Sequence, residues 1–112
     1  MITIPSATIV SPTDFKVRLH CADGSFDPSR DYLQIEFFIE DMRYEVVCDP
    51  ESDHYVNCRL DNGDLLVIFE NYPFVTGNLK YRMHARTTDA DFSDEYADKY
   101  STEASTGIEF IR

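Results

Sequence analysis

The alternation of apolar and polar residues along most of the chain is the feature that most limits its fold. Successive side chains of a β-strand point to opposite faces of a sheet, so a period of two is typical of a half-buried strand. The pattern occurs in residues 14–21, 33–40, 43–48, 55–60, 79–86 and 107–112. A continuous apolar run at residues 65–69 is typical of a strand covered on both faces. The sequence therefore predicts an all-β fold.

The segments between these runs carry residues that favour turns. Asn62-Gly63, within residues 61–64, is a strong β-hairpin signal. Asp41-Met42 is expected to turn the preceding strand back into the next one. Longer loops are predicted at residues 22–30, 71–77 and 89–98.

Two further segments, at residues 2–10 and 94–100, do not show the regular alternation of the predicted strands. Pro5 interrupts residues 2–10, so this segment can form only an edge strand or a bulged strand. Pairing of that edge with a second copy is one route to a homo-oligomer. A helix of at most one or two turns is expected at residues 94–100, where Tyr96 and Tyr100 lie four residues apart.

The number and spacing of the strands predict a particular architecture. Seven or eight short strands with frequent turns favour a β-sandwich of two antiparallel sheets, and an immunoglobulin-like topology fits the length of 112 residues. The chain contains no Trp, so the buried Trp of antibody domains is missing. Because no linker, repeat or low-complexity tract divides it, residues 1–112 are predicted to form a single domain.

Charge limits the partners that the chain can bind. The formal net charge of −11 repels phosphate backbones, which argues against direct nucleic-acid binding. No apolar stretch approaches the roughly 20 residues that span a bilayer, so no membrane association is predicted.

The cysteines and the N-terminus indicate where the protein folds. Cys21, Cys48 and Cys58 are an odd number, whereas a secreted disulfide scaffold usually has an even set. The first ten residues lack the basic region and long apolar run of a signal peptide. We therefore expect folding in a reducing cytoplasm, with free thiols.

Two groups of residues are candidate metal ligands. Residues 89–98 are rich in carboxylates, but they do not match the helix-loop-helix calcium pattern, because Asp94 replaces the required Gly and Tyr100 the final Glu. A solvated loop is the favoured interpretation. Cys48, His54 and Cys58 lack a fourth zinc ligand, and both cysteines fall on apolar positions, which favours small buried side chains. No metal or other cofactor is predicted.

The common catalytic motifs are missing from the sequence. The chain has no nucleophile elbow, no Gly-rich phosphate loop and no metal-hydrolase motif. The sequence therefore predicts that the protein is not an enzyme. An enzyme of a β-sandwich type would need ionisable groups brought together from distant segments.

Two predicted strands carry a basic residue or a histidine at each polar position. These residues are Lys16, Arg18 and His20 on one strand, and Lys80, Arg82, His84 and Arg86 on the other. If both strands lie in one sheet, they form a cationic stripe that favours an acidic protein partner over DNA. Cross-strand pairing with Glu36 and Glu40 would neutralise the stripe instead. The sequence does not distinguish these arrangements.

Aromatic residues in predicted loops are a second contact signal. These residues are Phe26, Tyr72, Phe74, Phe92 and Tyr96. Each could fold back as a plug at the end of the core, or it could anchor a partner, since large rigid side chains bind at low entropic cost. The residues predicted to contact a partner are Lys16, Arg18, Lys80, Arg82, Arg86, Tyr72, Phe74 and Phe92.

The second half of the chain contains three short motifs of low specificity. The first is a glycine, Gly77, followed by a predicted strand in which Leu79, Tyr81, Met83 and Ala85 occupy alternate positions. The second is an Asp-Phe-Ser-Asp loop at residues 91–94, and the third is Thr106-Gly107-Ile108 at the start of the last predicted strand. In these features the chain resembles small virion proteins of tailed phages and prophages of gut Bacteroidetes. The likeness extends from about Phe15 to Ile111.

The resemblance implies a fold and a role. Such modules are immunoglobulin-like β-sandwiches of head fibres, capsid auxiliary proteins or tail and baseplate fibres, and they have no active site. It implies a location in the virion, after assembly in the bacterial cytoplasm, with the major capsid protein or other virion proteins as partners. Because this chain stops at Arg112 without a stalk, a capsid auxiliary (decoration) protein is favoured over a tail or baseplate fibre adaptor.

One alternative from another class is a module that binds carbohydrate or a host surface. Tyr72, Phe74 and Phe92 would then stack on sugar rings, and Asp89 or Asp91 would hold a calcium ion. The absence of Trp, a favoured sugar-stacking residue, counts against this alternative.

Overall fold

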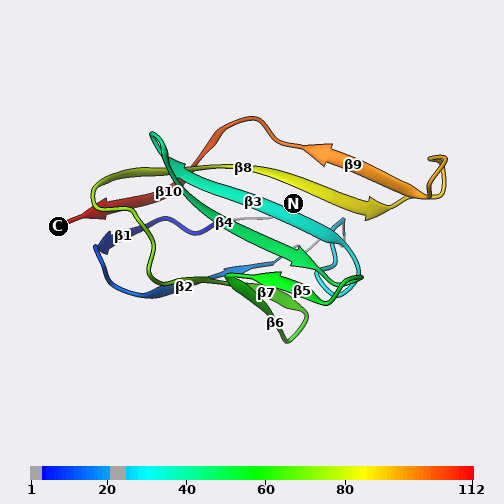
Figure 1. Ribbon diagram of the computed structural model, residues 1–112, viewed down its shortest axis with the longest axis horizontal. Helices are drawn as coiled ribbons and strands as arrows, with labels where there is room; N and C mark the ends of the chain where they lie inside the picture. Colours follow the sequence, from blue (N-terminus) through cyan, green and yellow to red (C-terminus); the bar gives the residue numbers. More distant parts are fainter. Residues whose placement is uncertain (1–3, 21–24) are drawn as a thin grey trace.

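The computed structural model describes residues 4–20 and 25–112, which form an all-β fold of two sheets (Figure 1). The strands are β1 (Ala7–Val10), β2 (Phe15–Leu19), β3 (Tyr32–Ile39), β4 (Met42–Asp49), β5 (His54–Val56), β6 (Cys58–Asp61), β7 (Asp64–Phe69), β8 (Gly77–Thr88), β9 (Tyr96–Tyr100) and β10 (Ala104–Ile111). The predicted all-β class is confirmed. These ranges contain no helix that could cross a membrane.

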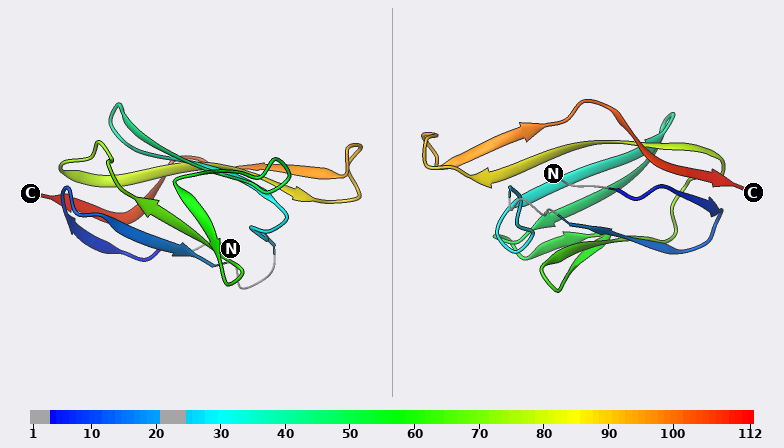
Figure 2. Two further views of the ribbon diagram at one scale, coloured as in Figure 1. Left: turned by 60° about the horizontal axis from the view of Figure 1, so that its bottom comes forward. Right: turned by 180° about the vertical axis from the view of Figure 1, so that it is seen from behind.

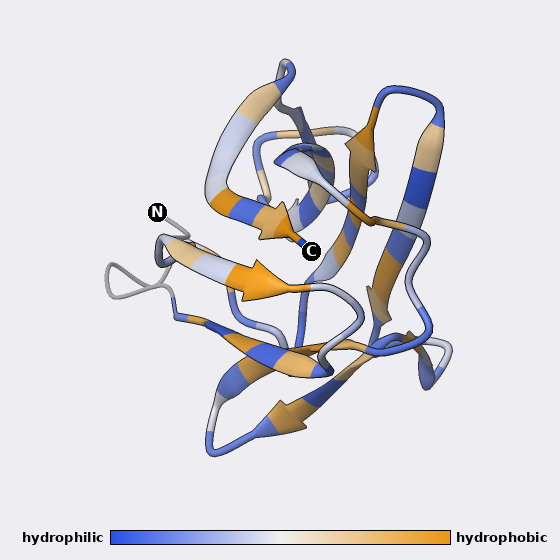
Figure 3. Cartoon of the chain, turned by 90° about the vertical axis from the view of Figure 1, so that its left-hand side faces the viewer, coloured by the Kyte–Doolittle hydropathy of each residue, from blue (hydrophilic) through white to orange (hydrophobic). Residues whose placement is uncertain are grey.

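The larger sheet has seven strands and the smaller sheet has three. The larger follows the order β1-β10-β8-β3-β4-β5, with β9 also paired to β8, and the smaller follows β2-β7-β6. The prediction of two purely antiparallel sheets is wrong at one edge, where β1 pairs with β10 in parallel. Figures 2 and 3 show that the large sheet curls, which brings β1 towards the small sheet. The predicted edge strand near Pro5 is confirmed as β1.

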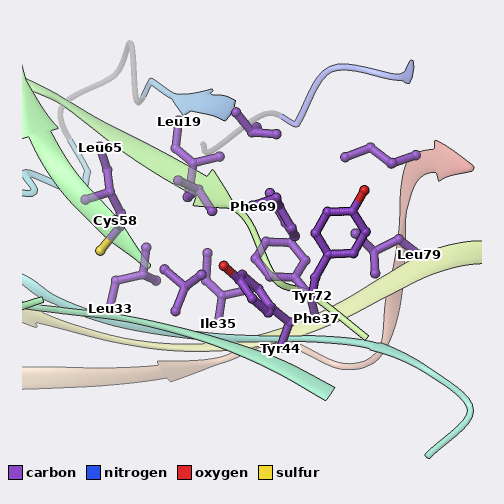
Figure 4. Packing of buried hydrophobic residues seen from close by; sticks show 14 of the residues in the cluster. Leu19, Leu33, Ile35, Phe37, Tyr44, Cys58, Leu65, Phe69, Tyr72 and Leu79 are labelled. Atoms are coloured by element: carbon purple, nitrogen blue, oxygen red, sulfur yellow. The ribbon is translucent and has the colours of Figure 1, made fainter. Parts of the chain in front are cut away.

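The core lies between the two sheets and is built around one aromatic ring. Phe69 on β7 is fully buried, and its ring centroid lies 4.5 Å from Phe15, 5.0 Å from Phe37 and 5.2 Å from Tyr44 (Figure 4). These partners come from β2, β3 and β4, so one side chain joins both sheets. Edge-to-face and offset aromatic pairs add to the free energy gained from burying their area.

Two of the predicted contact residues belong to this core. Tyr72 and Phe74 are 8% and 1% exposed, and their rings lie 5.1 Å and 5.5 Å from the ring of Phe110. The Tyr72 hydroxyl donates a hydrogen bond to the carbonyl of Thr13 at 2.6 Å. Phe26 is also buried. These loop aromatics therefore close the core, and their rings are not available to a partner or a sugar.

The strand predicted at residues 55–60 is divided between the two sheets. Val56 pairs with β4 and Cys58 with β7, and Asn57 between them has a φ of 55°. The Asn57 side chain donates to the carbonyl of Glu45 at 2.8 Å, and its own carbonyl accepts from Ile68 at 2.8 Å. Asn tolerates a left-handed conformation, so the chain changes sheets here with the Asn57 side chain and carbonyl both hydrogen-bonded.

The predicted turns and loops have mixed outcomes. The Asn62-Gly63 hairpin is confirmed, with φ values of 50° and 83° that match a type I′ turn. The reversal near Asp41 is also confirmed, since Ile39 pairs with Met42. The helix expected at residues 94–100 is wrong. Residues 96–100 form β9 instead, because they pair with β8, and Ala97 faces inward while Tyr96 and Asp98 are exposed. The additional strand β9 and the division of residues 55–60 into β5 and β6 bring the described strands to ten, above the seven or eight predicted.

The position of Phe69 generates a stability prediction. Phe69→Ala should lower the free energy of unfolding by about 3–5 kcal/mol, because it removes the ring that both sheets contact and leaves a cavity. Phe92→Ala, at a side chain that is 52% exposed, should change it by less than about 0.5 kcal/mol. Urea unfolding followed by circular dichroism measures both values. Equal destabilisation by the two variants would contradict the central role of Phe69.

Candidate functional site on the outer face of the large sheet

The outer face of the large sheet carries most of the basic residues that the sequence predicted as contacts. Side chains at alternate positions of β4, β3, β8 and β9 point away from the core, in a grid set by the strand register. Figure 1 shows these strands side by side. We call one set of these side chains the outer ladder: Arg43, Phe38, Lys80, Arg82, Tyr32, His84, Tyr100, Arg86 and Tyr96.

At one end of the outer ladder, two arginines cover Phe38. The guanidinium carbons of Arg82 and Arg43 lie 4.5 Å and 5.1 Å from the ring centroid, and only 4% of Phe38 is exposed. Glu36 Oε1 lies 3.3 Å from Nε of Arg43 and 3.6 Å from Nε of Arg82. Two guanidinium groups thus share one carboxylate, and each is held against the ring by a cation–π contact.

In the middle of the outer ladder, His84 lies between two tyrosines. Its ring is parallel to Tyr100, with centroids 4.3 Å apart, and it is tilted against Tyr32 at 5.4 Å. Its Nε2 is 2.8 Å from Asp98 Oδ1. His84 and Tyr100 form a non-hydrogen-bonded pair of the antiparallel ladder, where side chains approach most closely. Tyr100 is nevertheless 75% exposed, so its outer face is open to a partner.

At the far end, Arg86 joins β8 to β9. Its guanidinium carbon lies 4.9 Å from the Tyr96 ring centroid. It forms an ion pair with Asp94, and its Nε is 3.8 Å from Asp98. The same alternation of cation and aromatic ring therefore continues to the end of the hairpin, where Phe92 is exposed in the loop.

The basic residues of β2 lie elsewhere. β2 belongs to the small sheet, so Lys16 and Arg18 do not join Lys80, Arg82 and Arg86, and the single cationic stripe is not formed. The alternative of cross-strand pairing is confirmed for Glu36, which contacts Arg82. Glu40 instead offers its backbone carbonyl to Arg43.

Carboxylates also neutralise the β2 face. Arg18 bonds to Asp61 and, at 3.1 Å, to Asp64, while His20 Nδ1 lies 2.6 Å from Asp64. The hydrogen bond from Arg18 lowers the pKa of Asp61, and the contact with His20 followed by that with Arg18 lowers the pKa of Asp64. These hydrogen bonds in turn raise the pKa of Arg18. The cluster therefore joins β2 to the β6–β7 hairpin and presents little net charge.

Several residues of the outer ladder were not predicted as contacts. Phe38 occupies a polar position in the alternation of β3, and an aromatic residue among Gln and Glu was the one available signal. Tyr100 gives no signal, because its spacing from Tyr96 favours a helix at residues 94–100. Arg43 and Tyr32 needed the pairing of β3 with β4 and β8, which the sequence does not specify.

The two thiols are buried apolar residues, as predicted. Cys48 and Cys58 are free and 0% and 8% exposed, whereas His54 is exposed on β5. Burial raises the pKa of Cys48 to about 12 and that of Cys58 to about 11. Cys21 lies outside the described residues. Within residues 4–20 and 25–112, no three His, Cys, Asp or Glu side chains are grouped so that they could hold a metal ion.

The carboxylates of the loop before β9 have local partners. Asp89 accepts a hydrogen bond from the amide of Asp91 at 3.0 Å, and Asp94 accepts from the amide of Tyr96 at 3.1 Å. These bonds stabilise the turn between β8 and β9.

No protein-family model matches the chain, and neither a curated protein nor a solved structure matches it.

The burial of the thiols predicts slow chemical modification. In a Cys21→Ser variant at neutral to mildly alkaline pH, Cys48 and Cys58 should react slowly with Ellman's reagent, because the raised pKa leaves little thiolate and the sulfur atoms are inaccessible. The same sample in guanidinium chloride serves as the control and should release two equivalents rapidly. Immediate reaction of the folded variant, with its circular dichroism unchanged, would contradict the buried positions.

Proposed function

We propose that this chain is a non-enzymatic structural protein that binds other proteins through the outer ladder. The observation that carries the proposal is the alternation of guanidinium or imidazole groups with aromatic rings on one sheet face, where Arg43 and Arg82 cover the buried Phe38 and the rings of Tyr96 and Tyr100 are exposed. Arg, Tyr and Phe are enriched at protein interfaces, where a few such side chains supply most of the binding free energy. Stacking already restricts these side chains, so less conformational entropy is lost when a partner binds.

The charge of this face supports the same proposal. Four cations, Arg43, Lys80, Arg82 and Arg86, lie among five carboxylates, Glu36, Glu45, Asp49, Asp94 and Asp98, so the outer face carries only a small negative charge. The whole chain carries a formal net charge of −11. A partner that approaches the outer ladder therefore meets less repulsion than elsewhere on an acidic surface.

The assembly that we propose is a phage or prophage virion, with the chain as a capsid auxiliary protein bound to the major capsid protein. Support comes from the resemblance of residues 78–86, 91–94 and 106–108 to small virion proteins, which also carries the finer assignment of an immunoglobulin-like sandwich. On a capsid lattice, many weak contacts act together and give tight attachment. No catalytic step is needed for this role.

The proposal predicts recovery of the chain with purified particles and dependence of its binding on the outer ladder. Particles from a producing strain that lacks the gene should rebind the purified wild-type chain. Arg82→Ala combined with Tyr100→Ala should weaken rebinding roughly thirtyfold, equivalent to about 2 kcal/mol, because two exposed interface side chains are lost. Lys16→Ala, on the small sheet, is the matched control and should rebind normally. Quantitative mass spectrometry of the particles measures all three.

Copy number relative to the major coat protein tests the capsid role. On the order of hundreds of copies per particle would support decoration of a lattice. A dozen or fewer would point to the tail or portal and overturn the capsid assignment. Absence of the chain from particles of the producing strain would overturn the virion role itself.

A further inference from the structure

The outer edge of β9 has open backbone hydrogen-bonding groups. The bonds from Asp89 N to Glu95 O and from Ser101 N to Met83 O fix the alternation of the β8–β9 ladder. Residues 97 and 99 therefore direct their backbone groups towards β8, and residues 96, 98 and 100 direct theirs away from it. The amide of Tyr96 is already bonded to Asp94. The amide and carbonyl of Asp98 and the amide of Tyr100 have no partner among the described residues.

This edge is neither very short nor blocked by proline, so charge is its remaining protection against strand pairing. Edge strands are commonly very short, or they carry Pro or charged side chains, Lys in particular. β5 has three residues, and β2 carries Lys16 and Arg18 on its exposed face. β9 has five residues and no proline, and it carries one charge on each face, Asp98 on the outer face and Lys99, which pairs with Ala85, on the inner face. In Figure 1 and in the right-hand view of Figure 2, β9 runs along the margin of the molecule.

The side chains around the edge select a cationic occupant. Asp98 is flanked on the outer face by Tyr96 and Tyr100, and an added strand would place one side chain directly opposite each of them. From residue 84 to residue 100 the chain carries five carboxylates and two full cations, Arg86 and Lys99. A basic side chain opposite Asp98 would share its carboxylate with His84 and Arg86, and it would meet the net negative field of this stretch and the two tyrosine rings.

A second copy of the chain is a poor occupant of the same edge. Antiparallel pairing of two β9 strands about a two-fold axis at Asp98 would place the two Asp98 carboxylates directly opposite each other, which is destabilising. Each copy also carries a formal net charge of −11. Charge complementarity therefore favours a different protein with a basic segment.

The inner side of β9 offers space for apolar side chains of the same segment. A hollow of about 300 Å³ is lined by Phe26, Tyr81, Met83 and Ala85, together with Lys99. Side chains of an added strand that alternate with the basic residue would point to this side of the sheet. A segment that pairs with β9 is therefore expected to have a basic residue on the outer face and apolar residues at the adjacent positions, on the inner face.

We propose that the edge of β9 binds an extended segment of a partner protein as an additional strand, with Lys or Arg opposite Asp98 and apolar residues on either side of it. The main chain of the segment would bond to the open groups of Asp98 and Tyr100, the mode known as β-augmentation. This inference rests on the proposed protein-binding function and specifies the chemistry of the partner.

The experiment uses two capped nine-residue peptides as probes of the full chain. One has a central arginine with valine on either side and threonine beyond, and the other has glutamate in place of the arginine. The arginine peptide should shift the amide resonances of Asp98 and Tyr100, slow their hydrogen exchange, and bind roughly tenfold more tightly than the glutamate peptide. Asp98→Lys should reverse the preference, and Asp98→Asn, a milder change, should reduce it. Circular dichroism confirms that each variant is folded.

Several outcomes would overturn strand addition. These are no perturbation of the Asp98 amide by either peptide, equal affinity for both peptides, or perturbation of ladder side chains without protection of the β9 edge. Concentration-dependent protection of the Asp98 amide in the chain alone would assign the edge to a second copy. If the peptides fail but particles rebind the chain through Arg82 and Tyr100, only the strand addition is overturned. If the arginine peptide binds but particles do not, only the virion role is overturned.

Discussion

The burial of Phe69 between the two sheets is the interaction on which the rest of the structure depends. The small sheet has three strands, and β7 at its centre brings Phe69 against Phe37 and Tyr44 of the large sheet. The Tyr44 hydroxyl also donates to the carbonyl of Ile68 at 2.8 Å, so the aromatic contact and a hydrogen bond hold the same strands together. With the apolar faces of both sheets directed at this cluster, the polar positions of the strands are left for the surface.

The difference in sheet size explains the shape of the core. Three strands cannot cover seven, so the large sheet curls at its β1–β10 edge, and loop aromatics fill the remaining end. Tyr72 and Phe74 pack on Phe110 there. Because loops complete the core, the outer face of β4, β3, β8 and β9 is not needed to close it, although its cross-strand pairs stabilise the sheet. A solvated sheet face needs no row of stacked arginine, histidine and tyrosine rings, which is why the outer ladder attracts a functional interpretation.

The sequence predicted the parts of this fold that depend on local pattern, and it failed where tertiary contacts decide. Alternation placed β3, β4 and β8 correctly, and Asn62-Gly63 placed the hairpin. The change of sheet at Asn57 was hidden, because alternation continues through it and only the positive φ marks the break. The spacing of Tyr96 and Tyr100 fits a helix as well as a strand, and pairing with β8 decides between them. For the candidate site, Lys80, Arg82 and Arg86 follow from alternation, but their aromatic partners come from other strands and required the register.

One geometric fact connects the outer ladder to the edge of β9. In an antiparallel pair, residues at non-hydrogen-bonded positions have the closest side chains and direct their backbone groups away from each other. His84 and Tyr100 occupy such a position, so the stacking of their rings and the open amide of Tyr100 have the same cause. An added strand would continue the grid of outward side chains by one row, beyond Tyr96, Asp98 and Tyr100. The ladder and the edge would then act as one continuous surface, in which side chains recognise the partner and the backbone fixes its direction and register.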